Sequence, residues 1–223
     1  MERNVSLNEI SDGKLYGLND MVKAGCNNCK GCAACCRGMG NTILLDPLDI
    51  CRLTGNLNQS FEELLAGKLE LNIVDGVILP NLKMVGPDEH CPFLSDAGRC
   101  EIHSFRPGIC RLFPLGRYYE NHGYQYILQI HECPYPNKTK VKVRKWIDIP
   151  DIKDNEQFVI DWHYFLKDVQ GVLRRAGDDN LVKTITMYLL KSFYLKPYDN
   201  NADFYPQFYQ RLKDAKYYIS TLS

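Results

Sequence analysis

Five cysteines lie within eleven consecutive positions, from Cys26 to Cys36, and this cluster constrains the chain more than any other feature. Thiols packed so closely in a chain of 223 residues are more typical of metal ligands than of a disulfide framework, which mostly stabilises short secreted domains. The first fifteen residues mix acidic and basic side chains without an apolar run and predict no export signal. We therefore expect reduced, metal-binding thiols in a cytoplasmic protein.

Composition narrows the possible partners. Apolar residues make up 45% of the chain, which is enough to bury a core. Lys plus Arg and Asp plus Glu balance at 27 each, so no overall charge attracts nucleic acid or an anionic membrane. No apolar stretch approaches the roughly 18 residues that a membrane-spanning helix needs. We expect metal ions as partners, with no nucleic acid and no membrane, and interpret the basic run 138–145 as a solvated strand face.

The first cysteine block reads Cys29-Lys-Gly-Cys32-Ala-Ala-Cys35-Cys36. Two-residue gaps allow successive thiolates to turn back onto one centre, and the small intervening residues keep bulky side chains away from it. Adjacent side chains diverge, so Cys35 and Cys36 serve two metals or two corners of a cluster more easily than one tetrahedral ion. This pair favours an iron–sulfur cluster over zinc.

Four further cysteines follow in segments rich in Pro, Gly and His: Cys91, Cys100, Cys110 and Cys133. Together with the first four they make eight, which would fill two four-thiolate sites or one cluster and one zinc site. Clustered thiolates carry more negative charge than one divalent ion cancels. Three nearby arginines could offset the excess: Arg37, Arg106 and Arg111.

These blocks resemble the CxxCxxCC, or YkgJ-type, family of zinc- or iron-chelating cysteine-cluster proteins, which includes flagellin lysine N-methylases. The matching text is Cys29–Arg37, Cys91-Pro-Phe-Leu94, then Cys100-x-Ile-His103-x-x-Arg106-Pro-x-x-Cys110-Arg111-x-Phe113-Pro114, and Cys133. The resemblance covers roughly residues 26–135 and implies metal or iron–sulfur binding by the eight cysteines. As an alternative it implies protein lysine N-methylation, with S-adenosylmethionine as cofactor and a protein or peptide as substrate. The chain has no glycine-rich loop typical of that cofactor.

Two cysteines fall outside the family pattern. Cys26 creates the spacing Cys26-x2-Cys29-x2-Cys32-x3-Cys36, which is typical of ferredoxins and gives a second alternative, a small electron carrier. The match is partial because Arg37 replaces the usual proline, so whether Cys26 ligates stays open. Cys51 is predicted to be a small buried core thiol.

Two histidines near the cysteine blocks are further candidates. His103 is expected behind the ligands rather than on the metal, although ligation stays an alternative, and His90 could substitute for a ligand.

The predicted fold class is α+β. Residues 1–150 should form a small, irregular, cysteine-rich, metal-bound module with β-hairpins, and residues 151–223 a helical segment packed on it. Asp75-Gly76 predicts one hairpin, and 121–123 the turn of a second. Residues 41–45 could form a strand, 46–53 a helix that ends at Gly55, and 1–25 at most one short helix. Helical periodicity predicts three C-terminal helices, whose aromatic residues we assign to the core rather than to a peptide groove.

Overall fold

The computed structural model of the chain describes residues 6–26 and 32–222. Its contacts divide the chain into two compact units, one formed by residues 1–40 and 84–160 and the other by residues 41–83 and 161–223. The predicted α+β class is confirmed: helices accompany three two-stranded antiparallel sheets in the described part of the chain. The proposed domain boundary at residue 150 stays a prediction.

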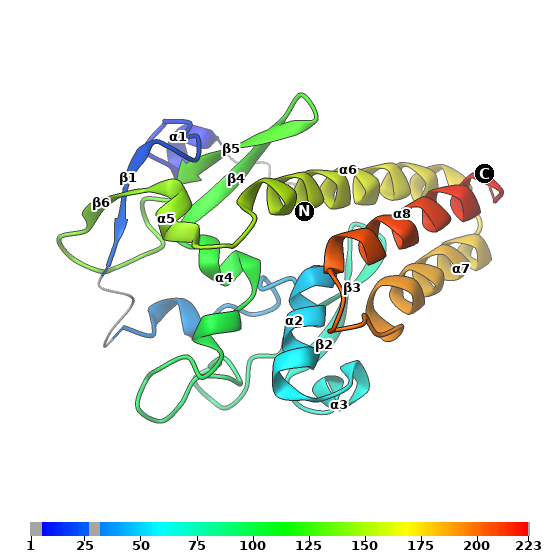
Figure 1. Ribbon diagram of the computed structural model, residues 1–223, viewed down its shortest axis with the longest axis horizontal. Helices are drawn as coiled ribbons and strands as arrows, with labels where there is room; N and C mark the ends of the chain where they lie inside the picture. Colours follow the sequence, from blue (N-terminus) through cyan, green and yellow to red (C-terminus); the bar gives the residue numbers. More distant parts are fainter. Residues whose placement is uncertain (1–5, 27–31, 223) are drawn as a thin grey trace. The chain divides into compact units, whose positions relative to one another are not determined.

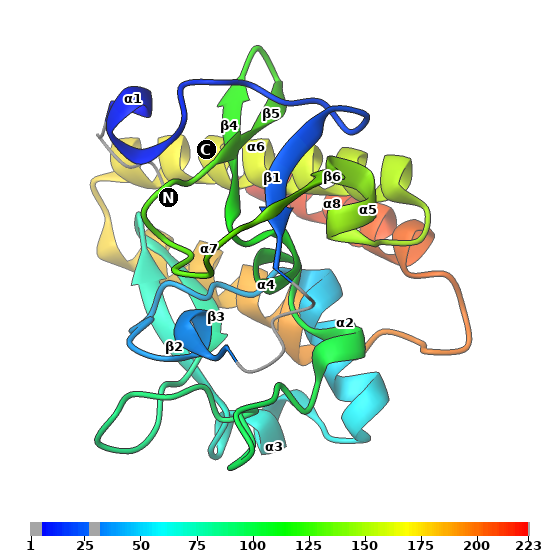
Figure 2. The ribbon, with the colours of Figure 1, turned by 90° about the vertical axis from the view of Figure 1, so that its left-hand side faces the viewer.

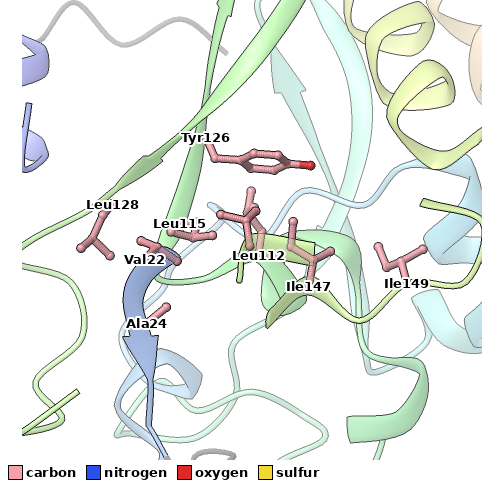
Figure 3. Packing of buried hydrophobic residues seen from close by; sticks show 9 residues of the cluster. Val22, Ala24, Leu112, Leu115, Tyr126, Leu128, Ile147 and Ile149 are labelled. Carbon is pink, nitrogen blue, oxygen red and sulfur yellow. The ribbon is translucent and has the colours of Figure 1, made fainter. Parts of the chain in front are cut away.

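The first unit holds all the cysteine blocks. Its elements are α1 (Leu7–Ile10), β1 (Met21–Gly25), the 3₁₀ turns η2 (Ala34–Cys36) and η3 (His103–Phe105), α4 (Gly108–Leu112), β4 (Leu115–Glu120), β5 (Gly123–Leu128), β6 (Thr139–Lys142), α5 (Val143–Ile147) and the start of α6 (Ile152–Ala176). Figure 3 shows its core, in which side chains from β1, β4, β5 and the short helices α4 and α5 pack together. Val22, Leu115 and Ile147 are each at most 2% exposed.

Strand β1 was missed by the sequence analysis, which expected at most a short helix before residue 26. The strand pairs with β6, which lies more than a hundred residues later in the chain, as Figure 2 shows. Val22 and Ala24 alternate with exposed Met21 and Lys23, the normal pattern for a strand with one buried face. Because its partner strand β6 is so far away in the sequence, β1 has no adjacent turn motif from which it could be predicted.

The hairpin of β4 and β5 confirms the predicted turn. Asn121 and His122 both have positive φ, at 51° and 55°, as a tight two-residue turn between twisted strands requires. The Tyr126 hydroxyl, on β5, donates a 3.0 Å hydrogen bond to Oε1 of Glu156 in the first turns of α6. This bond fixes the start of α6 against the hairpin.

The second unit is formed mainly by helices. It contains α2 (Pro47–Leu57), α3 (Phe61–Leu65), β2 (Leu69–Val74), β3 (Val77–Leu82), the rest of α6, α7 (Asp179–Leu190), the π-helical turn η4 (Lys191–Leu195) and α8 (Phe204–Ser220). Capping boxes at Asp46 and Ser60 open α2 and α3. The Asp75-Gly76 hairpin is also confirmed, with φ of 50° and 87° at its two turn residues.

Three local predictions were wrong. Residues 41–45 form no strand, only an isolated bridge between Leu44 and Asn81. Helix α2 continues through Gly55 to Leu57. Gly55 does not end the helix; it allows close packing against Asn200, because a Cβ at this position would lie 2.9 Å from Oδ1 of Asn200. The basic run is part strand and part helix, since β6 ends at Lys142 and α5 follows immediately.

The C-terminal aromatic residues pack mainly in the core of the second unit. The Trp162 ring lies 4.8 Å from that of Phe193 and 6.0 Å from that of Phe208, centroid to centroid, and both phenylalanines are fully buried. Figure 1 shows α8 alongside α6 and α7, and the stacked rings of Tyr188 and Tyr218 join α7 to α8. This packing supports the core interpretation over a peptide groove.

Among the described residues, no helix is both long enough and apolar enough to cross a membrane.

Candidate metal centre

The first cysteine block begins where β1 ends. Cys26 follows Gly25 directly and is 2% exposed, whereas Cys29 lies outside the described residues. The chain then forms η2, in which the Cys36 amide donates to the carbonyl oxygen of Ala33 over 2.9 Å. This tight turn presents Cys35 and Cys36 as partly buried neighbours.

The second block lies antiparallel to the first. The Cys91 amide donates a 2.8 Å hydrogen bond to the Cys36 carbonyl oxygen, and the Gly38 amide donates to that of Glu89 over 2.9 Å. An isolated bridge between Arg37 and His90 lies between these two bonds. Main-chain hydrogen bonds therefore join two cysteine blocks that are widely separated in sequence.

The thiols of four cysteines interact in this region. A hydrogen bond to Cys36, followed by burial, raises the pKa of the Cys35 thiol. Burial raises the pKa of Cys91 to about 11 and also raises that of Cys100, and Cys35 acts electrostatically on both. Cys35, Cys36, Cys91 and Cys100 therefore form one group, which we call the Cys35 group.

A second set of thiols lines a pocket in the first unit. Its walls come from Cys26, Cys32, Ala34, Cys35, Phe113, Pro114, Cys133, Pro134, Tyr135 and Trp146. Cys133 interacts electrostatically with Cys26 and Cys32, so these thiols are neighbours. Cys35 belongs to both sets and connects the pocket with the Cys35 group. Trp146 was not predicted from the sequence because no motif contains it; its indole Nε1 donates to the Phe113 carbonyl oxygen over 3.2 Å.

Three cysteines share one local geometry. The main-chain amide two residues further along donates a hydrogen bond to each sulfur: Phe93 to Cys91, Ile102 to Cys100 and Tyr135 to Cys133. Each bond lowers the pKa of its thiol against the stronger, opposite effect of burial. Hydrogen bonds to sulfur stabilise the thiolate, which is the form that binds metals.

The three arginines have different environments. Arg106 attracts the thiolates of Cys35 and Cys100 and lowers both pKa values, as predicted for an arginine that offsets their charge. Arg37 instead pairs with Asp88 at the surface. Arg111 is buried and donates to the main-chain carbonyl oxygens of Ser104 and Asp148.

The two candidate histidines, His103 and His90, each contact a charged side chain. Nε2 of His103 contacts the Arg106 guanidinium, and burial followed by the charge of Arg106 lowers the pKa of this imidazole. A neutral His103 therefore contacts Arg106, and its place behind the metal ligands stays a prediction. Nδ1 of His90 lies 2.6 Å from Oδ1 of Asp88 at the surface.

Two cysteines remain. Cys110 lies in α4 and is half-buried. Cys51 lies in α2 of the second unit, where its Sγ is 3.7 Å from Oδ1 of Asn200. It is half-buried rather than buried as predicted, and this partial burial raises its pKa.

Within residues 6–26 and 32–222, no three His, Cys, Asp or Glu side chains converge closely enough to hold a metal ion. The described thiols adjoin one another but do not form a coordination sphere for a single ion. The assignment of the eight cysteines as ligands stays a prediction.

Comparison with known families places the chain in a metal-chelating class. Residues 28–140 match the CxxCxxCC family, described as "Putative zinc- or iron-chelating domain". This segment is more than half of the chain, which therefore belongs to the CxxCxxCC family. The predicted resemblance to this family is confirmed. No curated protein and no solved structure matches the chain.

Proposed function

We propose that this protein binds an iron–sulfur cluster, or else a two-metal thiolate centre, through Cys29, Cys32, Cys35, Cys36, Cys91, Cys100, Cys110 and Cys133. The observation that carries the proposal is the main-chain hydrogen bond from Cys91 to Cys36, which brings two separate cysteine blocks together. Burial raises the pKa of the Cys91 and Cys100 thiols, which disfavours the thiolate that a nucleophile needs. The arrangement suits ligands that a metal deprotonates as it binds.

The environment of Arg106 fits an anionic sulfur centre. Its buried Nε atom has no hydrogen-bond partner among the described residues. A buried, unsatisfied guanidinium N–H is costly, and a metal-bound thiolate or sulfide beside Cys35 and Cys100 would satisfy it. Once bound, the metal centre would supply thiolate charge neutralisation and, if it contains iron, electron transfer.

The spread of the thiols favours a polynuclear centre. The described side chains adjoin one another without meeting at one point, as a single tetrahedral ion would need. A cluster holds its ligands around a larger inorganic core. The adjacent pair Cys35 and Cys36 suits such a centre for the same reason.

The first experiment is metal analysis with a visible spectrum on protein purified without oxygen. Brown protein with iron and acid-labile sulfide in equal amounts supports the cluster. Colourless protein with zinc overturns the cluster and keeps the thiolate centre, whereas protein without metal overturns both. Cys35→Ser should lose metal, and Cys51→Ser is the matched control because Cys51 lies in the other unit.

Two alternatives remain proposals with their own tests. A lysine N-methyltransferase would bind S-adenosylmethionine in calorimetry with metal-loaded protein, and no detectable heat would exclude it. A small electron carrier would show a reversible low-potential redox couple, which a zinc protein lacks.

A further inference from the structure

Cys26 occupies a tightly determined position. It follows the last residue of β1, and the pairing of Gly25 with Thr139 fixes the main chain just before it. A Cβ at Gly25 would lie 2.3 Å from Oγ1 of Thr139, so the two strands are in close contact at this point. The Cys26 side chain is 2% exposed and lines the pocket described above.

Three other thiols line the same pocket: Cys32, Cys35 and Cys133. They come from two parts of the chain: Cys32 precedes η2 and Cys35 lies within it, whereas Cys133 follows β5. Lys138 Nζ donates a 2.7 Å hydrogen bond to the Cys133 carbonyl oxygen and fixes this segment. These four thiols line one pocket without meeting at a single point among the described residues, and four is the number of thiolates that hold an iron–sulfur cluster around its larger inorganic core.

We propose that Cys26, which lies outside the family-matched residues 28–140, is a ninth metal-binding thiol that shares a site with Cys32, Cys35 and Cys133. The inference rests on the proposed metal-binding function. An isolated buried cysteine is normally a small apolar core residue. Cys26 differs because other thiols line the same pocket, whose walls also include the apolar side chains of Phe113, Pro114 and Trp146.

The test compares metal content in Cys26→Ser, Cys133→Ser and the double variant, with Cys51→Ser as control. If Cys26 and Cys133 serve one site, each single variant loses the same amount of metal and the double variant loses no more. If Cys26→Ser retains all its metal while Cys133→Ser loses metal, Cys26 is not a ligand, and the proposed metal-binding function still stands. Wild-type protein that binds no metal overturns the proposed function itself, so the two failures are distinguishable.

Thermal unfolding with and without chelator separates a ligand from a packing residue. As a ligand, Cys26 contributes only when metal is bound, so the metal-dependent rise in Tm should be much smaller in the variant than in the wild type. An equal drop in Tm in both conditions assigns it to packing and overturns the proposal. Cys26→Ala repeats the comparison without a buried hydroxyl. Cobalt-loaded wild type and variant should differ in thiolate-to-cobalt charge-transfer intensity, and identical spectra contradict ligation.

Discussion

The guanidinium of Arg106 acts directly on the Cys35 thiol and lowers its pKa, while His103 contacts the same guanidinium. The Arg106 guanidinium therefore interacts with both the His103 imidazole and the Cys35 thiol. Its charge opposes the two effects that keep Cys35 protonated, the hydrogen bond to Cys36 and burial.

Removing this charge should weaken metal binding. Partners outside the ligand shell typically contribute a factor of about 10 to 100 in metal affinity, so we expect Arg106→Gln to bind metal about tenfold more weakly. Competition with a chelator of known affinity measures the change. Arg99→Gln is the matched control, because Arg99 is exposed and acts electrostatically on His103. Equal losses in both variants would point to general surface charge instead.

The contact between Gly25 and Thr139 gives a second prediction. A Cβ at Gly25 meets both Oγ1 and, at 3.1 Å, the carbonyl oxygen of Thr139. We expect Gly25→Ala to lower the free energy of unfolding by about 2 kcal/mol, as is typical of an overpacked site. Denaturant unfolding of the full chain, compared between the wild type and Gly25→Ala, measures this loss of stability.

Two further variants make this test specific. Thr139→Ala in the Gly25→Ala background removes one of the two contacts and should restore part of the stability. Gly17→Ala, whose nearest atom lies at 3.5 Å, should be nearly neutral. A loss at Gly17 equal to that at Gly25 would refute the steric explanation.

Metal uptake should depend on pH. Burial raises the pKa of Cys91 to about 11 and also raises that of Cys100, so both thiols are protonated near pH 7 in the metal-free protein. A thiol must lose its proton to bind metal, so affinity rises with pH and falls in acid, with about one proton released per thiol. Calorimetry in two buffers of different ionisation enthalpy counts these protons. Cys91→Ser should release fewer, and the absence of proton release in the wild type would mean that the thiols are already ionised.

Arg211 should stabilise the second unit independently of metal. Its guanidinium donates to the carbonyl oxygens of Ser192, Lys196 and Pro197, at 2.9, 2.6 and 2.6 Å, and lies 3.6 Å from the centre of the Tyr198 ring. Arg211→Met leaves these carbonyls without their donor, so we expect a loss of roughly 2–4 kcal/mol.

The matched control for this arginine is Lys213→Met, which removes an exposed charge from the same helix. It should change the free energy of unfolding by less than about 0.5 kcal/mol. Chelator should not alter the effect of Arg211→Met, and a metal-dependent loss would contradict a purely structural role.

Features that depend on neighbours in sequence were predictable. The capping boxes at Asp46 and Ser60 and the Asp75-Gly76 turn use hydrogen bonds and φ preferences within a few residues. The cysteine blocks were recognisable for the same reason. The pairing of β1 with β6 was not, because it depends on residues that approach only in the folded chain. The surroundings of Cys26 and the position of Trp146 are of the same kind: each depends on which distant segments form the pocket.

The pairing of β1 with β6 also has a consequence for biosynthesis. Cys26 follows one strand and Cys133 precedes the other, so every cysteine of the proposed centre lies inside the loop that these strands close. The ribosome must release residues 139–142 before the loop can close. Metal delivered earlier meets an open chain whose thiols are exposed to oxidation. We expect insertion of the metal to follow completion of this segment, and truncation before Thr139 to give nascent chains that cannot retain it.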